Sequence, residues 1–240
     1  MKEKKSTEKI KRRLQNMRYK NITVFTGAGV SADSGLPTFR EPNGLWNNHN
    51  PDIVSHSDGF ELSREEFMHF WDTVKGEFVG NKFKPNKAHE LIARWEYVQT
   101  SIGGKFNLIT TNVDNLHDLA GSSDPIKIHG DILVDGREYE YEVEGQLFSW
   151  KMPDVVLFGD TVKRQKDMWD AVYKTDLFVC VGSSCSLGEG AIVKAAKDDG
   201  AVTVEINPNP TGNKNFDVVI KKSATEGLAD LSTLVMGAKG

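Results

Sequence analysis

The sequence predicts an α/β fold in which a Rossmann-like parallel sheet carries helices on both faces. Short apolar runs alternate along the chain with segments of helical periodicity, as in doubly wound α/β domains. The first run, Ile22–Phe25, is β-branched and aromatic and leads directly into Gly27-Ala28-Gly29. Ala32 stands where a third small residue completes a G-x-G-x-x-A turn, which in such folds follows the first strand.

The strands are predicted from short apolar runs, and Asp154–Phe158 and Leu177–Val181 are assigned to the parallel sheet. Alternating polar and apolar residues over Arg137–Ser149 predict a hairpin that turns at Glu144-Gly145-Gln146. The other extended pieces are Phe106–Thr110, Lys127–Gly130, Val202–Ile206 and Asp217–Ile220.

The helices are predicted from apolar stripes at helical spacing. Ser63–Phe78 carries such a stripe behind Ser63 and Glu66, which have the spacing of a capping box. The stripe consists of Phe67, Phe70, Trp71, Val74 and Phe78. A second helix starts at Pro85 and runs through Trp95, and further helices are expected at Gln165–Tyr173, Ala191–Lys197 and around Leu228–Leu234. Glu41–Ser57 is expected to be a long ordered loop that closes over a ligand.

Composition describes an ordinary globular protein. Hydrophobic residues make up 38% and charged residues 27% of the 240 residues. Since no apolar run approaches the roughly 20 residues that span a bilayer, and no apolar signal segment is visible, we expect a cytoplasmic protein without a membrane partner. Cys180 and Cys185 provide neither a disulfide framework nor a four-thiolate metal site.

Residues 1–20 form a basic segment, with nine Lys or Arg against two Glu. We expect a solvated amphipathic helix with Ile10, Leu14 and Met17 on one side. An arm that binds nucleic acid or a protein partner is the alternative, and the sequence does not favour a nucleic-acid partner.

The glycine turn is the first candidate ligand site. Gly27 and Gly29 permit a tight turn in which backbone N–H groups approach a diphosphate, and a following helix would add its N-terminal partial charge. An ordinary glycine-rich turn is the alternative. The next residues, Ser34-Gly35-Leu36-Pro37-Thr38-Phe39-Arg40, place a proline, an aromatic residue and an arginine close to that turn.

Several ordered blocks resemble the sirtuins, which are NAD-dependent protein deacylases. Ile22–Arg40 resembles the cofactor loop GAGxSxxSGIPxFR, and Thr110–Gly121 (TTNVDNLHDLAG) resembles TQNIDxLHxxAG. KIHGD (127–131), MPDVVLFGD (152–160), VGSSCS (181–186) and VEINPNPT (204–211) follow in the family's order, and PNKAHELIARWE (85–96) resembles its PNxAH helix. The resemblance therefore covers the chain from about Ile22 to Leu228 and implies a catalytic domain over 21–240, with small-module insertions at approximately 42–84 and 132–152.

The resemblance implies an NAD-dependent lysine deacylase that acts on acyl-lysine proteins or peptides. His129 is the implied base that removes a proton from a ribose hydroxyl, and Asn112 and Asp114 assist at the nicotinamide ribose. Val156, Phe158 and Gly159 are the implied substrate-binding residues. The implied NAD-binding set is Gly27, Ala28, Gly29, Ala32, Pro37, Thr38, Phe39, Arg40, Asn112, Asp114, Gly182, Ser183, Ser184 and Asn207. An Asx turn after a strand is the alternative for Asn112 and Asp114, and we interpret His89 as a structural or surface residue and His117 as structural.

The chain departs from the family pattern in ways that bear on function. Residues 130–153 contain no cysteine, so we expect no zinc and a metal-free hairpin instead, with Glu138, Glu140, Glu142 and Glu144 on its polar face. Thr111 replaces the usual glutamine. Trp71-Asp72-Thr73-Val74 replaces the Tyr-x-x-Arg of desuccinylating relatives, which predicts uncharged acyl groups. A sirtuin-like NAD hydrolase or ADP-ribosyltransferase with the same pocket is the alternative function, and a non-catalytic NAD sensor is disfavoured because Asn112, Asp114 and His129 are present.

Overall fold

A six-stranded parallel sheet forms the body of the molecule. The computed structural model describes residues 14, 19–36, 49–80, 82–186 and 188–235. The strand order is β3-β2-β1-β6-β7-β8, and all neighbouring strands are parallel. Their bounds are β1 (Asn21–Thr26), β2 (Lys105–Thr110), β3 (Ile126–Lys127), β6 (Leu177–Val181), β7 (Val202–Ile206) and β8 (Val218–Ile220). The predicted fold class is therefore confirmed.

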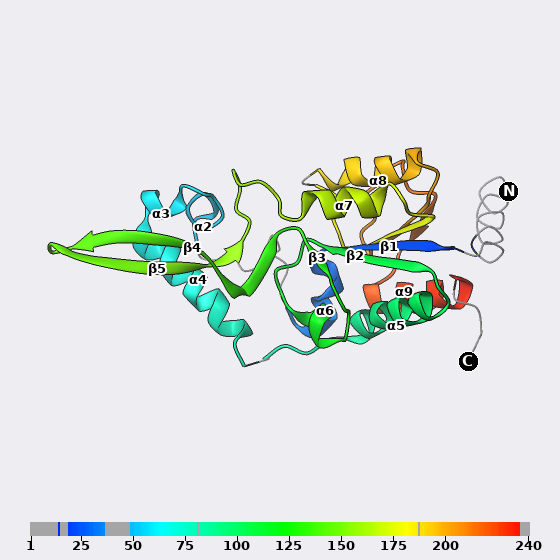
Figure 1. Cartoon of the computed structure of the whole chain (residues 1–240), viewed down its shortest axis with the longest axis horizontal. Helices are drawn as coiled ribbons and strands as arrows, with labels where there is room; N and C mark the ends of the chain where they lie inside the picture. Colours follow the sequence, from blue (N-terminus) through cyan, green and yellow to red (C-terminus); the bar gives the residue numbers. More distant parts are fainter. Residues whose placement is uncertain (1–13, 15–18, 37–48, 81, 187, 236–240) are drawn as a thin grey trace.

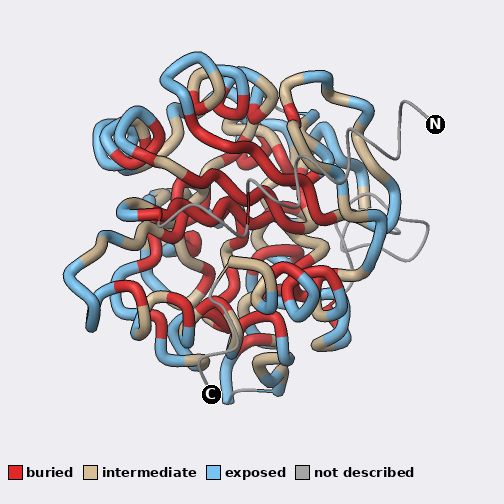
Figure 2. Tube along the Cα trace, turned by 90° about the vertical axis from the view of Figure 1, so that its right-hand side faces the viewer, coloured by how far each residue is buried: buried red, intermediate tan, exposed pale blue. Residues whose placement is uncertain are grey.

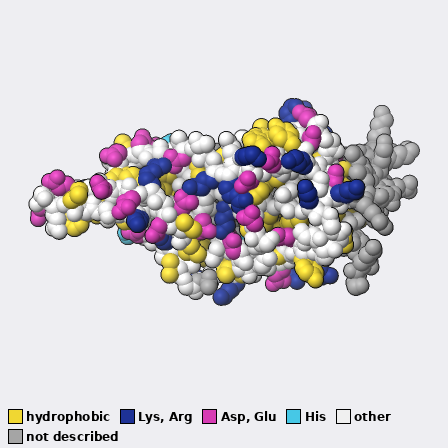
Figure 3. Space-filling view, in the orientation of Figure 1, with side chains coloured by type: hydrophobic (Ala, Val, Ile, Leu, Met, Phe, Trp, Pro, Cys, Tyr) yellow, Lys and Arg dark blue, Asp and Glu magenta, His cyan; other side chains and the backbone are white. Residues whose placement is uncertain are grey.

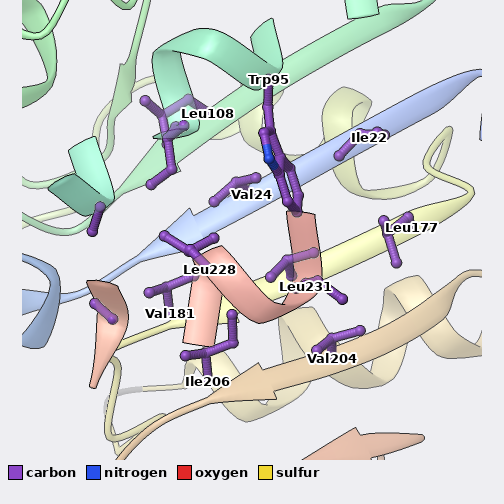
Figure 4. Close-up of a cluster of buried hydrophobic side chains, with 14 of the residues drawn as sticks. Ile22, Val24, Trp95, Leu108, Leu177, Val181, Val204, Ile206, Leu228 and Leu231 are labelled. Carbon is purple, nitrogen blue, oxygen red and sulfur yellow. The ribbon is translucent and has the colours of Figure 1, made fainter. Parts of the chain in front are cut away.

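Helices cover both faces of this sheet, as Figure 1 shows. On one face, α5 (Lys87–Ser101) and α9 (Ala224–Val235) enclose a cluster in which Trp95, Leu228 and Leu231 meet the sheet residues Ile22, Val24 and Val204 (Figure 4). On the other face, α7 (Gln165–Val172) and α8 (Glu189–Asp198) pack through Met168, Val172 and Val193 onto Phe25 and Phe178. Because β1, β6 and β7 are buried on both faces, they appear in red through the centre of Figure 2.

A smaller module projects from the sheet. It contains α2 (Pro51–Val54), α3 (Gly59–Leu62), α4 (Arg64–Phe78) and a long hairpin of β4 (Gly130–Val143) and β5 (Gln146–Val155). Phe60 stacks on Tyr139 with ring centroids 4.2 Å apart, and Phe67 packs edge-on against Trp150. The hairpin extends away from the body (Figure 1), and acidic and hydrophobic side chains share its protruding end (Figure 3).

Several predicted elements have different partners or bounds in the structure. Asp154–Phe158 is not a strand of the parallel sheet, because Asp154 and Val155 end β5 and pair antiparallel with Asp131 and Gly130. Phe158 makes only an isolated parallel bridge, to His56. An apolar run of this length fits either kind of strand, so the sequence alone did not identify its partner.

The connection before α4 also differs from the prediction. Residues 41–48 of the expected loop lie outside the described residues, but Pro51–Val54 forms α2, which Asn50 caps by accepting a hydrogen bond from Asp52 N at 3.1 Å. The capping box predicted at Ser63 and Glu66 is wrong, because Ser63 makes no side-chain cap and Glu66 instead accepts from Asn50 N at 3.0 Å.

The third strand of the sheet is shorter than predicted. Of the predicted extended piece Lys127–Gly130, only Lys127 belongs to β3, which begins one residue earlier, at Ile126. Gly130 begins the hairpin with a φ of 88°, a left-handed conformation that favours glycine.

In the basic N-terminal segment only Leu14 is described up to residue 18, and it is buried in the cluster under α5 and α9. No helix among the described residues combines the length and apolarity needed to cross a membrane.

Candidate active site

The candidate site lies where the parallel strands end. Parallel strands direct their carboxyl ends to one edge of the sheet, so the loops that follow them converge there. Gly27–Gly29 follows β1, Thr111–Asp114 follows β2, His129 follows β3, and Gly182–Ser184 follows β6. Asn207 comes directly after β7. The topology therefore brings together residues from five separate sequence blocks.

The glycine turn packs directly on the loop after β6. Gly27 N donates to Val181 O at 3.0 Å and Gly29 N donates to Gly182 O at 2.9 Å. A Cβ atom at Gly27 would lie 2.8 Å from Ser183 Cα, and one at Gly29 would lie 2.8 Å from Gly182 Cα. Close packing between two loops of the protein itself therefore requires these glycines, and their two N–H groups already have protein acceptors.

The helix expected after this turn is absent from the described residues. The chain instead forms two short 3-10 turns, η1 (Ala28–Val30) and η2 (Ala32–Ser34), and Gly35 follows in a left-handed conformation. A single 3-10 turn aligns few peptide dipoles, so the expected helix charge is not provided here. The predicted cofactor residues Pro37, Thr38, Phe39 and Arg40 lie outside the described residues.

Ser31 joins Asn112 and Asp114 into one buried hydrogen-bonded chain. Asn112 Nδ2 donates to Ser31 Oγ at 3.1 Å, and Ser31 Oγ donates to Asp114 Oδ2 at 2.9 Å. Asp114 Oδ1 accepts from Leu116 N at 3.0 Å, which is the Asx turn considered as the alternative. Asp114 thus has both roles at once, a local turn and a contact with the loop after β1.

Burial raises the pKa of Asp114. Hydrogen bonds from Leu116 N, Ser31 and Asn112 and the positive charge of Lys127 oppose this effect. Lys127 itself pairs with Asp118 and Asp131, each at 2.6 Å. Keeping the Asp114 carboxylate ionised at this depth therefore depends on its hydrogen bonds.

His129 is half-buried and contacts the loop after β2 and the segment that follows β5. Desolvation lowers the pKa of its imidazole, against the opposing effects of the Glu189 charge and a hydrogen bond to the backbone of Thr111. The His129 carbonyl accepts from Val156 N at 2.9 Å. A lowered pKa keeps the imidazole neutral at physiological pH, which is the form that accepts a proton.

The loops after β6 and β7 are also joined. Asn207 Nδ2 donates to Ser183 O at 2.9 Å, and Gly182 N donates to Ile206 O at 2.9 Å. Ser184 is exposed, and its hydroxyl lies 2.7 Å from that of Ser186. This end of the site presents hydroxyl and amide groups, which suit ribose and phosphate oxygens.

The predicted substrate segment is fixed to the smaller module. Phe158 N donates to Ser55 O at 2.8 Å, and Ser57 N donates to Phe158 O at 3.0 Å. Gly159 follows with a φ of 96°. Val156, Phe158 and Gly159 thus lie in a segment that leaves the hairpin beside His129 and pairs with residues 55–57 on one edge.

Two buried histidines, His89 and His117, hydrogen-bond to the end of β1 and the turn after it, which confirms the structural interpretation of both, although the sequence did not predict these contacts. His89 Nε2 lies 3.4 Å from Ser31 Oγ, while its Nδ1 accepts from Asn86 N at 3.2 Å as part of a capping box on α5. His117 Nε2 lies 3.0 Å from Thr26 Oγ1. Burial lowers the pKa of His89 to about 4 and that of His117 well below its usual range. His89 is therefore not a surface residue, and the spacing Asn86-x-x-His89 was the available signal.

Two further observations concern an apolar hollow beside α4 and the search for metal ligands among the described residues. A hollow of about 210 Å³ lies beside α4, and its lining consists of Leu36, His49, Phe70, Thr73, Val74, Glu77, Phe78 and Phe83. Across the part of the chain that the structure describes, no three His, Cys, Asp or Glu side chains are grouped so as to hold a metal ion.

Comparison with known proteins gives a consistent result. The family model described as the Sir2 family matches residues 27–137. An NAD-dependent protein deacylase of Vibrio parahaemolyticus is 35% identical over 211 residues, which cover 82% of this chain and 86% of that protein. An NAD-dependent protein deacylase of Leishmania major is 34% identical over 215 residues, covering 81% and 86%.

Solved structures agree with these relatives. A Sir2 homologue in complex with ADP ribose superposes with a TM-score of 0.78 at 28% identity, covering 96% of this chain and 97% of that one. A Sir2 homologue in complex with NAD superposes with a TM-score of 0.76 at 28% identity, covering 96% and 94%.

Proposed function

The chain belongs to the Sir2 family, and on that premise we propose that it is an NAD-dependent protein lysine deacylase. Its substrates are NAD and a protein or peptide that carries an acylated lysine, and its products are nicotinamide, the free lysine and O-acyl-ADP-ribose. The position of His129 carries this proposal. Its imidazole bonds to the backbone of Thr111, beside Asn112, and its carbonyl bonds to Val156, at the start of the substrate segment.

The residues at the sheet edge fit a dinucleotide. We assign Gly27, Ala28, Gly29 and Ala32 to the diphosphate side, and Gly182, Ser183, Ser184 and Asn207 to the adenosine side. The assignment is supported by the direct packing of the two loops, in which Gly29 N donates to Gly182 O at 2.9 Å, so that they form one cradle at the edge of the sheet, and by the exposed hydroxyl of Ser184. When bound, NAD supplies a nicotinamide leaving group and a ribose carbon that takes the acyl oxygen.

His129 acts as the general base at a ribose hydroxyl. Its lowered pKa keeps Nδ1 or Nε2 free of a proton at physiological pH. Asn112 Nδ2 donates to Ser31, and the side chain of Asn112 also hydrogen-bonds Asp114, so its carbonyl oxygen is the group available to orient ribose or nicotinamide. Asp114 holds Ser31 from the opposite side and fixes that orientation.

The substrate peptide binds by strand addition to Val156–Gly159. Phe158 already uses its N–H and C=O on residues 55–57, so we place the acyl-lysine peptide on the opposite edge of this segment. Strand addition gives affinity through backbone hydrogen bonds without requiring a particular sequence. The backbone hydrogen bond from Val156 N to His129 O supports this placement, because it puts the edge proposed to receive the peptide next to the proposed base.

Three finer assignments follow from the same site. We propose that the hairpin needs no zinc, because aromatic packing of Tyr139 and Trp150 on α3 and α4 holds it. We propose uncharged acyl groups, because Val74 and the carboxylate of Glu77 both line the hollow beside α4. Acyl-lysine peptide and NAD are the proposed partners.

The decisive experiment incubates the protein with NAD and an acetyl-lysine peptide and separates the products by mass spectrometry. O-acetyl-ADP-ribose is expected. His129→Ala should lower product formation by about 10²–10⁴-fold, with NAD affinity largely kept and nicotinamide exchange in the presence of peptide better preserved than product formation. His69→Ala, which removes an exposed histidine of α4, is the matched control and should behave as wild type.

An NAD hydrolase or ADP-ribosyltransferase is the second candidate. The observation in its favour is Thr111, which stands in place of the family's usual glutamine and so offers no amide to orient the ribose. Its hydroxyl instead donates to Thr26 O at 3.3 Å, toward β1. This activity would cleave NAD without peptide, and His129→Ala and Asn112→Ala would lower that cleavage alike. Rapid peptide-independent cleavage, with free ADP-ribose as the product when peptide is present, would replace the deacylase proposal by this one.

A further inference from the structure

The two cysteines of the chain lie side by side at the adenosine end of the candidate site. Cys180 is buried in β6, and Cys185 is half-buried in the loop that follows. Their Sγ atoms are 3.8 Å apart. Five residues of extended chain would separate the two by roughly 16 Å. The loop doubles back instead, through left-handed conformations at Gly182 (φ 63°) and Cys185 (φ 51°). The second is uncommon for a residue with a Cβ.

The two thiols have different chemical characters. A hydrogen bond from the Cys180 thiol, together with one from Ser183, lowers the pKa of Cys185. The same hydrogen bond and complete burial raise the pKa of Cys180, as do the charges of Glu205 and Glu189. Cys185 is thus the more acidic and more accessible thiol, while Cys180 is a protected neighbour. Redox-active pairs commonly combine an accessible, acidic attacking thiol with an adjacent resolving thiol.

The loop that carries Cys185 is the one assigned to NAD. Cys185 N donates to Ser183 Oγ at 3.1 Å, and Ser183 O accepts from Asn207 Nδ2 at 2.9 Å. Gly182 O accepts from Gly29 N at 2.9 Å. A displacement of Cys185 therefore acts on both loops of the dinucleotide cradle.

We propose that Cys180 and Cys185 form a reversible redox-modification site, in which a hydroperoxide converts them to a disulfide that weakens NAD binding. The effect on NAD rests on the proposed function, whereas formation of the disulfide does not.

The chemistry balances with one peroxide. The Cys185 thiolate attacks one oxygen of hydrogen peroxide, the O–O bond breaks, and the departing hydroxide takes a proton to become water. The sulfur of Cys180 then attacks the resulting sulfenic sulfur. The S–S bond forms, the S–O bond breaks, and the hydroxide leaves as water with the proton of Cys180. Two thiols lose two electrons, and the peroxide is reduced to two waters. A dithiol such as dithiothreitol reverses the change by thiol–disulfide exchange.

The structure indicates which part moves. A disulfide requires an S–S distance of about 2.05 Å, so the sulfurs must approach by about 1.8 Å from 3.8 Å. Cys180 is held in the middle of the sheet, in register with Phe25 of β1 and Glu205 of β7. Residues 182–186 must therefore move to bring the sulfurs together, and these residues include the proposed ligands Ser183 and Ser184.

The test uses the full chain, first reduced and then treated with about one equivalent of hydrogen peroxide. Because the chain has two cysteines, intact mass should fall by two hydrogen atoms and the free-thiol count should go to zero. NAD affinity, measured by calorimetry, should fall about tenfold or more, within the usual range of coupling between two sites. Dithiothreitol should restore both the mass and the affinity.

Two variants, each compared with itself before and after peroxide, make the result specific. Cys185→Ser should keep its NAD affinity through the treatment, because the attacking thiol is gone. Cys180→Ala should accumulate a sulfenic acid at Cys185 that dimedone traps, and should form no intramolecular disulfide.

Two results would contradict the inference, and a third would contradict the proposed function instead. Overoxidation of Cys185 in the wild type while Cys180 stays free would overturn the disulfide, and an oxidised protein with unchanged NAD affinity would overturn its effect. If the reduced protein does not bind NAD, the proposed function fails instead, while the mass measurement still decides whether the pair forms.

Discussion

Gly27→Ala is the sharpest test of how the site is built. The added Cβ would lie 2.8 Å from Ser183 Cα, 2.9 Å from Gly182 O and 3.0 Å from Ser183 Cβ. Ordinary contact begins at 3.4 Å, so the turn after β1 and the loop after β6 must separate by about 0.6 Å. The first two of these atoms are backbone, so a side-chain rotation cannot relieve the clash.

The cost follows from that separation. Overpacking of this kind costs about 1–3 kcal/mol. The hydrogen bond from Gly27 N to Val181 O, now 3.0 Å long, is stretched at the same time, which adds about 1 kcal/mol. A loss of about 2–4 kcal/mol lowers the Tm of a domain of this size by about 5–15 °C. NAD affinity should fall as well, because both halves of the proposed cradle move.

Gly76→Ala is the matched control. Gly76 lies in α4, and an added Cβ there meets no atom within 4 Å. Alanine should raise the free energy of unfolding by about 0.5–1 kcal/mol through helix propensity and reduced unfolded-state entropy. Circular dichroism should be used to measure the Tm of both variants, and calorimetry to measure their NAD affinity, each in comparison with the wild type. A Gly27→Ala protein that melts within about 1 °C of wild type and binds NAD normally would refute the packing argument.

The remaining predictions concern pH, metal and acyl specificity. The folded state holds His89 neutral with a pKa of about 4, while the unfolded chain takes up a proton below about pH 6.5. The part of the stability that depends on His89 should therefore be constant above that pH and fall by about 2 kcal/mol between pH 7 and pH 5, and buried His117 adds to this decrease; urea unfolding should show this dependence and His89→Gln should reduce it. Chelators should leave Tm unchanged, and elemental analysis should find less than one zinc per chain; one tightly bound zinc would contradict the metal-free hairpin. Acetyl-lysine or longer aliphatic acyl-lysine should be processed faster than succinyl-lysine, and Val74→Arg should narrow the difference; equal or faster desuccinylation by the wild type would reject the uncharged pocket.

Local patterns in the sequence were sufficient to predict the main architecture. β1 and the strands on either side of it are short apolar runs separated by helical stretches, and Gly27 directly follows β1. Parallel topology then places the end of every such strand at one edge. The convergence of Asn112, His129 and Ser183 follows from that topology, without knowledge of any side-chain contact.

Contacts between residues far apart in the sequence were not predictable in this way. The bond between Ser31 and Asp114 joins residues 83 positions apart, and that between Ser31 and Asn112 joins residues 81 apart. The spacing of apolar residues along the sequence does not predict a hydrogen bond between such distant polar residues. The proximity of Cys180 and Cys185 depends on two left-handed residues, one of which is not glycine, and composition gives no sign of that conformation.

The hairpin connects the smaller module to the site, although the described residues of that module include no group of side chains that could hold a metal ion. β4 begins one residue after His129, and β5 ends one residue before Val156, so both functional segments emerge from its base. Phe60 and Phe67 of α3 and α4 pack against Tyr139 and Trp150 further along the hairpin. Aromatic pairs of this kind contribute about 0.5–1.5 kcal/mol each beyond the area that they bury. Several such pairs fix the angle at which the hairpin leaves the sheet, and through it the separation between His129, the proposed base, and the edge that we propose receives the substrate peptide.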